Sequence, residues 1–256
     1  DFYNNYLTNF HDNAIEIDGS LHNIRVMRNL MLNSASHPMC NQPAAGGPVY
    51  WIRNIAYHAP GGSTRLTSGS AGALFYNNTI LTETAAGSSA NVHWRNNLML
   101  GQNAAPAIFN VTTNTGYSSS DFNGFRPNPG APASFHWNSP AAPHGVGDGT
   151  RESLQTRQFA TLADYARATG QDQHSVTVDY DVFMAVPKLD ARDLATVQRL
   201  YDGKSLDFRL RPGSAAVDRG VAIPNVTDGS AGAAPDLGAL EAGQPLPVYG
   251  PRPHAP

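Results

Sequence analysis

The chain has 256 residues, enough for one elongated domain with a sizeable core, and 41% of them are hydrophobic while only 14% are charged. A net charge of −3 argues against a nucleic-acid partner, which requires a basic stripe, and the apolar runs are too short for a membrane span. The single cysteine, Cys40, excludes an intramolecular disulfide framework, and its apolar surroundings favour a buried residue over a nucleophile.

The beginning of the chain has the pattern of a repeat already under way. The first residue is Asp1 rather than methionine, and Phe2 already belongs to the first copy of the repeat. We therefore expect an N-terminal portion to precede this sequence, in which no signal peptide is visible. An open first coil leaves backbone N–H and C=O groups unpaired, so we expect it to pair with a missing segment or with another chain.

A short phrase centred on asparagine recurs along the first half of the chain. The copies follow one another at steps of 24, 25, 24, 18 and 27 residues. The aligned residues are Asn5, Asn29, Asn54, Asn78, Asn96 and Asn123. Because strand-like segments flank each asparagine, this period predicts an all-β fold, a parallel β-helix with one strand–turn–strand coil per repeat. Inward asparagines at the turns can bond to their counterparts in neighbouring coils.

An arginine stands directly before three of the aligned asparagines. These arginines are Arg28, Arg53 and Arg95. Their shared position predicts an outer stack of arginines over the turn.

The phrase from His11 to Gly19 is the most informative candidate for chemistry. Alternation places Ile15 and Ile17 on one face of a strand and Glu16 and Asp18 on the other, roughly 6–7 Å apart. Two carboxylates at that distance can share the acid and base work of glycoside hydrolysis, in either the retaining or the inverting geometry.

Two other interpretations of this acidic phrase stay open. It can be a solvated strand face, or a calcium site built from Asp12 and Asp18. In the first interpretation, Glu16 and Asp18 are catalytic candidates and Asp12 binds substrate.

Coils of about 24 residues place further polar residues over the two carboxylates. Positions 40–42 fall on the next coil and positions 65–66 on the one after, which brings Gln42 and Arg65 into the same stack. An arginine suits the clamping of a sugar carboxylate better than proton abstraction.

A polysaccharide lyase needs a cation to neutralise the uronate carboxylate and a base to take the adjacent proton. The predicted coils contain no lysine, so Arg65 is the candidate cation and His11, beside Asp12, the candidate base. Arg25 and Trp137 are further candidates for substrate binding, with Trp137 in a loop-rich segment as a groove wall.

The composition changes after the coils. Of the 21 asparagines, 20 lie at or before Asn138, so we assign residues 1–125 to the coils and 126–256 to a C-terminal extension. The extension contains Pro- and Gly-rich loops, short helices expected at 161–170 and 190–201, and closing strands expected at 208–210 and 237–241.

The end of the chain resembles a known group of proteins. The stretches 208–220 (FRLRPGSAAVDRG) and 235–241 (PDLGALE) are similar to the closing signature of bacterial right-handed β-helix proteins of the pectate-lyase-like superfamily. The succession of 12–18, 42–48 (QPAAGGP) and 64–66 (TRL) resembles members with an acidic phrase, a Gln-Pro phrase and a basic residue on successive coils. The basic residue is commonly lysine in that family, whereas this chain has Arg65.

The resemblance implies a right-handed parallel β-helix. It also implies a protein that acts on an extended carbohydrate, outside the cell or at its surface. The superfamily holds lyases, hydrolases, epimerases and non-catalytic members, so the fold alone does not decide the activity. Our first hypothesis is a polysaccharide lyase or glycoside hydrolase without a definite cofactor, calcium being the possible one. The alternative is a non-catalytic module that binds glycan or assembles with a partner chain.

Overall fold

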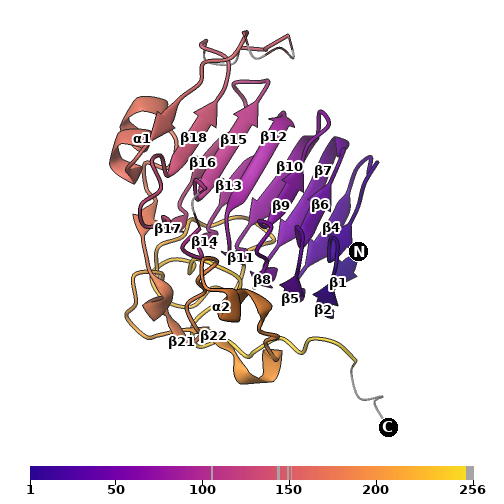
Figure 1. The fold of residues 1–256 in the computed structure, drawn as a ribbon, viewed down its shortest axis with the longest axis vertical. Coiled ribbons are helices and arrows are strands. Elements are labelled where there is room, and N and C mark those ends of the chain that lie inside the picture. Colours follow the sequence, from indigo (N-terminus) through magenta and orange to yellow (C-terminus); the bar gives the residue numbers. More distant parts are fainter. Residues whose placement is uncertain (105, 143–144, 149, 151, 252–256) are drawn as a thin grey trace.

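Three parallel β-sheets wind into a solenoid in the computed structural model, which describes residues 1–104, 106–142, 145–148, 150 and 152–251. Each coil contributes one strand to each sheet, and the coils stack along one axis (Figure 1). The parallel β-helix predicted from the asparagine repeat is therefore confirmed. It is followed by a loop-rich extension whose two α-helices are short.

The strands of each sheet come from successive coils. The first sheet contains β1 (Phe2–Tyr3), β4 (Ile24–Met27), β7 (Ala45–Ile52), β10 (Ala71–Tyr76), β13 (His93–Arg95) and β16 (Ser119–Asp121). The second contains β2 (Tyr6–Phe10), β5 (Leu30–Ser34), β8 (Ile55–Tyr57), β11 (Thr79–Leu81), β14 (Leu98–Leu100), β17 (Gly124–Arg126) and β20 (Val176–Thr177).

The third sheet has an irregularity in its middle. Its first part contains β3 (Ile15–Glu16), β6 (Met39–Asn41) and β9 (Thr64–Leu66), and its second part β12 (Thr84–Ser89), β15 (Phe109–Thr113), β18 (Phe135–Asn138) and the antiparallel β19 (Gln158–Phe159). Between β9 and β12, the Thr64 hydroxyl accepts a hydrogen bond from the Ala85 N–H and donates one to the Ala85 carbonyl. A side chain thus replaces the regular backbone ladder where the two parts meet.

An asparagine ladder fastens each coil to the next at the turn between the first and second sheets. In every step the side-chain Oδ1 of one asparagine accepts bonds from the backbone N–H and the Nδ2 of the asparagine one coil earlier, at 2.8–3.1 Å. The members are Asn5, Asn29, Asn54, Asn78, Asn97 and Asn123. The predicted fifth member was Asn96, which is wrong by one residue, because Asn97 occupies that place in the ladder.

The residue before each ladder asparagine adopts the left-handed conformation, and this explains the error. Asn96 has φ 58° and occupies the same place as Arg28 and Arg53, with φ 52° and 53°. Arg95 lies one residue earlier, on β13, where it bonds to the Trp94 carbonyl and to Ser119. The expected stack of three arginines is therefore wrong.

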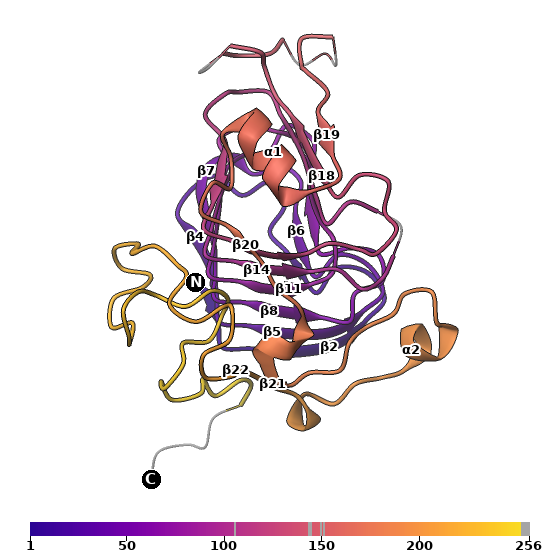
Figure 2. The same cartoon turned by 90° about the vertical axis from the view of Figure 1, so that its left-hand side faces the viewer.

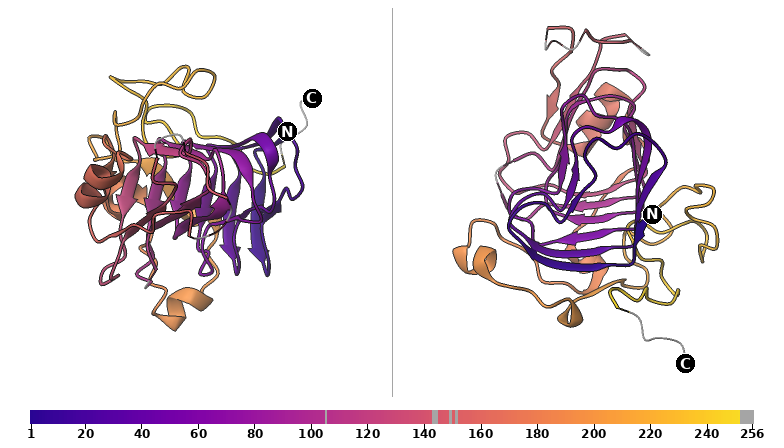
Figure 3. Two further views of the ribbon diagram at one scale, coloured as in Figure 1. Left: turned by 90° about the horizontal axis from the view of Figure 1, so that it is seen from above. Right: turned by 90° about the vertical axis from the view of Figure 1, so that its right-hand side faces the viewer.

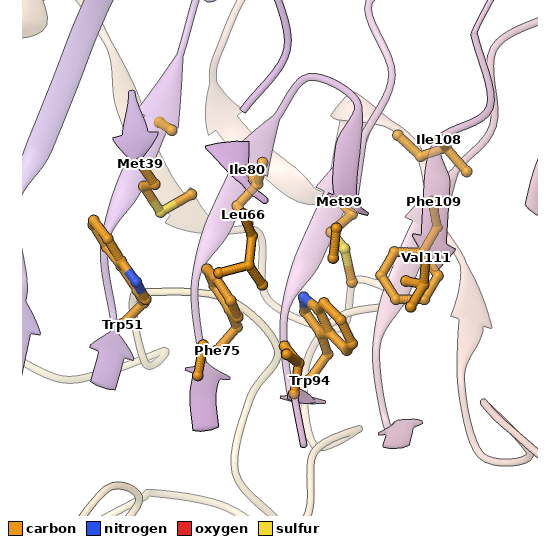
Figure 4. Packing of buried hydrophobic residues seen from close by; sticks show 14 of the residues in the cluster. Met39, Trp51, Leu66, Phe75, Ile80, Trp94, Met99, Ile108, Phe109 and Val111 are labelled. Carbon is orange, nitrogen blue, oxygen red and sulfur yellow. The ribbon is translucent and has the colours of Figure 1, made fainter. Parts of the chain in front are cut away.

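The interior of the coil is filled by stacked apolar side chains from each of the three sheets. Trp51, Phe75 and Trp94 occupy the inner face of the first sheet on successive coils, with ring centroids 6.2 and 5.9 Å apart (Figure 4). The second sheet contributes Met31, Ala56, Ile80, Met99 and Phe125 to the same core. This inward row is what forces the alternate side chains of each strand to face outward.

A short helix covers the far end of this core. The helix α1 (Leu162–Thr169) begins after the N-cap Thr161, which accepts a bond from the Asp164 N–H, and it ends at Gly170, whose φ is 73°. Its Tyr165 is fully buried and stacks on Phe135 at 5.1 Å. Figure 2, which looks along the stack, shows α1 over the end of the coil. The helix expected at 161–170 is confirmed.

The rest of the extension packs against the outer face of the second sheet. It contains the 3-10 turns 180–182 and 203–205, the hairpin of β21 (Phe183–Ala185) and β22 (Asp207–Leu210), and α2 (Leu194–Gln198). Its apolar residues form a second core with the outward leucines of the solenoid, such as Leu32 and Leu100. The segment runs outside the coil in Figures 2 and 3, while the first coil faces the viewer on the right of Figure 3.

Two expectations about this extension need correction. The helix expected at 190–201 spans only Leu194–Gln198, because Tyr201 bonds to the Asn33 side chain through its N–H and its carbonyl and draws the chain back to the solenoid. Residues 237–241 form no strand, and the N–H groups of Gly238 and Ala239 bond individually to the solenoid atoms Asn96 O and Thr79 Oγ1. Within the described residues, no helix is long and apolar enough to cross a membrane.

Candidate functional site

The outer face of the third sheet brings the predicted acidic and basic residues together. Glu16 pairs with Cys40, and Cys40 pairs with Arg65, on three successive coils. Asp18 lies one step further, where its Oδ1 accepts a 2.7 Å bond from the Gln42 N–H. The predicted stack is therefore formed, and we call Glu16, Asp18 and Arg65 the charged cluster. The inner face of the same strands is apolar, with Ile15, Met39 and Leu66 in the core.

The two carboxylates of the charged cluster are exposed and close. One oxygen of Glu16, one oxygen of Asp18 and the Sγ of Cys40 all lie within 4.8 Å of one another. The Nδ2 of Asn13 donates a 2.8 Å bond to Glu16 Oε1. Asp18 Oδ1 also accepts a 3.5 Å bond from the Cys40 thiol, so donors hold one oxygen of each carboxylate and leave the second oxygen available to a ligand.

The cation of the cluster is less exposed than the carboxylates. Arg65 is half-buried, and its guanidinium has no hydrogen-bond or ion-pair partner among the described residues. Burial lowers the pKa of the neighbouring His37, the Arg65 charge lowers it further, and Asp12 opposes both. His37 is therefore neutral near pH 7, which makes it available as a proton acceptor beside the cluster.

Cys40 lies between the two carboxylates and the arginine, but its thiol is not reactive. Its burial, together with the Asp18 and Glu16 charges, raises the pKa of the thiol to about 12. Two carboxylates and a protonated thiol make a poor ligand set for calcium, which prefers six to eight oxygens. The closely spaced group also joins Asp18 to Glu16 rather than to Asp12. This group therefore gives no support to the alternative interpretation of a calcium site built from Asp12 and Asp18.

We expect Cys40 to resist thiol reagents at neutral pH in the folded protein and to react once the chain is unfolded, as a colorimetric thiol assay would record. Because the folded state holds the proton more tightly, the Cys40 contribution to stability is complete below pH 9.0 and is lost as the pH rises towards about 12. Cys40→Ala should remove that alkaline loss in denaturation curves. Rapid labelling of the folded protein near pH 7 would contradict this assignment.

The structure places Arg25 and His11 away from the charged cluster and Gln42 beside it. Arg25 lies on β4 of the first sheet and pairs with Asp1 at 2.7 Å. His11 is exposed in the turn before β3 and lines a cavity of about 510 Å³ with Phe10, His58 and Leu200. Gln42 is close to the cluster, and its Oε1 accepts a 3.2 Å bond from Thr67.

The expectation that Trp137 forms a groove wall is wrong. Trp137 lies on β18 rather than in a loop, with a side chain only 2% exposed. It packs against Trp94, Phe109 and Tyr165 in the core. Successive side chains of β18 point alternately into and out of the coil, so its outward residues are His136 and Asn138.

A groove on the second part of the third sheet was not found from the sequence. It has a volume of about 590 Å³ and lies over the outward side chains of β15, β18 and β19, walled by part of the loop before β19. The described residues that line this neutral groove are Thr67, Gly87, Ser88, Asn110, Thr112, Asn114, His136, Asn138, Thr150, Leu154, Thr156 and Gln158. A signal was present, since the phrases 109–112 (FNVT) and 135–138 (FHWN) repeat the same alternation 26 residues apart.

Comparison with models of protein families, with curated proteins and with solved structures finds no match for this chain. The function is therefore inferred from the fold and from the geometry of the outer face.

Proposed function

We propose that this protein binds an extended carbohydrate along the outer face of the third sheet and cleaves it by hydrolysis, with Glu16 and Asp18 as the catalytic carboxylates. The same proposal places the chain in the pectate-lyase-like superfamily and, because its substrate is a polymer, outside the cell or on its surface. A stack of parallel strands suits such a ligand, since it offers a long shallow surface rather than a closed pocket.

The observation that supports hydrolysis is the closeness of the two exposed carboxylates. Their nearest oxygens lie within 4.8 Å, nearer to the separation of about 5–5.5 Å typical of retaining glycosidases than to the 6.5–9.5 Å of inverting ones. In that geometry one carboxylate attacks the anomeric carbon while the other protonates the leaving oxygen and later activates water. Arg65, one strand beyond Cys40, is placed to hold a substrate oxygen or carboxylate.

Elimination is supported less well than hydrolysis. A lyase needs a base beside its cation, and His11, the expected base, lines a cavity whose described lining does not include Arg65. Neutral His37 is the remaining base near Arg65, and its involvement would produce an unsaturated sugar.

The test is an assay of neutral and uronate-containing polysaccharides, following new reducing ends and ultraviolet absorbance in parallel. We expect reducing ends without absorbance. Glu16→Gln and Asp18→Asn should each lower kcat by about 10²–10⁴-fold while thermal unfolding stays unchanged, because both side chains are exposed and the amides keep one accepting oxygen.

Asp181→Asn is the matched control, since Asp181 is an exposed carboxylate on the 3-10 turn of the extension. It should leave turnover unchanged. Full activity in both Glu16→Gln and Asp18→Asn would exclude them as catalysts, and absorbance rising with reducing ends would replace hydrolysis by elimination.

A non-catalytic glycan-binding module is the second candidate. It is favoured by the neutral groove, which has polar side chains but no carboxylate among its described lining residues. Binding without turnover of any polysaccharide would support it.

A further inference from the structure

The floor of the neutral groove is a row of polar side chains in strict register. Asn110 on β15 pairs with His136 on β18, and His136 pairs with Gln158 on β19. Asn110 and Gln158 are exposed and His136 is half-buried, so all three reach the groove from the outward face. Neighbouring strands are about 4.8 Å apart, which spaces the three side chains evenly across the floor.

These three side chains have no hydrogen-bond partner among the described residues. The second row of the floor differs, because Asn138 Nδ2 donates to Thr112 Oγ1 at 3.1 Å and Asn138 Oδ1 accepts from the Arg157 N–H. The groove therefore contains one row whose side chains hold each other and one row whose donors and acceptors remain free for a ligand.

The described residues that line the groove also carry no charge. None of its described lining residues is Lys, Arg, Asp or Glu, and burial lowers the pKa of His136 so that its ring is neutral near pH 7. An anionic sugar would lose hydration here without gaining a cation, whereas hydroxyl groups can both donate to and accept from amides and a neutral imidazole. Leu154 in the wall offers an apolar surface to the C–H groups of a sugar ring.

We propose that the neutral groove is a binding subsite for uncharged, hydroxyl-rich sugar residues, held by Asn110, His136 and Gln158. This inference rests on the proposed function and names the substrate class. The charged cluster lies further along the same sheet, with Arg65 three strands from His136, or roughly 14 Å. A glycan that reaches both sites runs along the solenoid axis and presents neutral residues to the groove.

The test measures oligosaccharide binding by calorimetry, with uncharged gluco-, manno- and xylo-oligosaccharides and uronate oligosaccharides of equal length. We expect the uncharged ligands to bind with an affinity that is unaffected by salt, because no ion pair is involved. Asn110→Ala combined with His136→Ala should weaken that binding about tenfold or more, since two hydrogen-bonding groups are lost. Gln244→Ala, an exposed amide outside the groove, is the matched control and should bind like the unmodified chain.

Each result bears on one proposal separately. The protein could instead bind uronate oligosaccharides more tightly than uncharged ones, with an affinity that is lowered by salt and by Arg65→Ala but not by the groove variants. That result would overturn the neutral subsite and leave the proposed function unaffected. Groove-dependent binding of uncharged ligands without turnover would keep the subsite and overturn the hydrolase. Binding by none of the oligosaccharides would overturn the subsite, and the polysaccharide assay would then decide the function alone.

Discussion

Replacing Asn78 by alanine is expected to lower the free energy of unfolding by about 3–5 kcal/mol. Asn78 is fully buried in the middle of the ladder. Its Oδ1 accepts from the backbone N–H and the Nδ2 of Asn54, and its own Nδ2 donates to the Trp51 carbonyl and to Asn97 Oδ1. Alanine removes all four bonds and leaves their partners unsatisfied away from water, which costs more than the bonds themselves contribute.

Urea or thermal denaturation measures this loss, and Asn5→Ala is its control. Asn5 is the half-buried end member of the described ladder, and its side chain only donates, to Tyr3 O and Asn29 Oδ1. The control should cost about 1 kcal/mol or less. Equal losses in the two variants would show that burial within the ladder has no energetic effect.

Asp172→Ala is expected to destabilise the fold by about 3 kcal/mol. Asp172 is buried where the ladder ends, and it accepts bonds from Asn123 Nδ2, Ser175 Oγ and Tyr165 Oη. Removing the carboxylate leaves the buried Tyr165 hydroxyl without its acceptor and takes one acceptor from Ser175 Oγ and one from Asn123 Nδ2, which still donates to Ser120 Oγ. Asp172→Asn keeps an accepting oxygen and should cost about 1 kcal/mol at pH 7.

The same pair of variants has a pH signature. Burial raises the pKa of Asp172 above its usual 3.8, despite the bonds that oppose the shift. The folded state therefore holds the proton more tightly than the unfolded state, so the Asp172 contribution is complete below pH 3.8 and declines as the pH rises through the folded-state pKa. As the pH rises from about 4, the free energy of unfolding should decline less for Asp172→Asn than for the unmodified chain. An unchanged profile would contradict this role of the charge.

The repeat predicted the fold because each solenoid coil is a continuous segment of the chain, so its length equals the spacing of the repeated asparagines in the sequence. Four of the ladder residues aligned at 24 or 25 residues, and the fifth failed because Asn96 and Asn97 are adjacent and only one can point inward. Backbone conformation decides between them: Asn96 takes the left-handed position of the turn. Asp172 was missed because it lies outside the repeat and joins the ladder only through tertiary packing.

The charged cluster was predictable for the same reason as the ladder. A constant coil length places Glu16, Cys40 and Arg65 in one stack, as their pairing confirms. Trp137 was misplaced because Pro- and Gly-rich neighbours suggested a loop, whereas the alternation of its own strand places the ring inside. The separation of His11 from Arg65 depends on the turns between strands, whose paths no repeat determines.

The ladder has a direction as well as a length. Every amide donates towards later coils and accepts from earlier ones, so the side-chain dipoles align and their positive ends point at Asp172. Aligned hydrogen bonds polarise one another, and a row of this kind favours negative charge at its donor end. The ladder thereby offsets part of the cost of burying that carboxylate. A substitution several coils away, such as Asn29→Ala, is accordingly expected to shift the Asp172 titration without touching the residue.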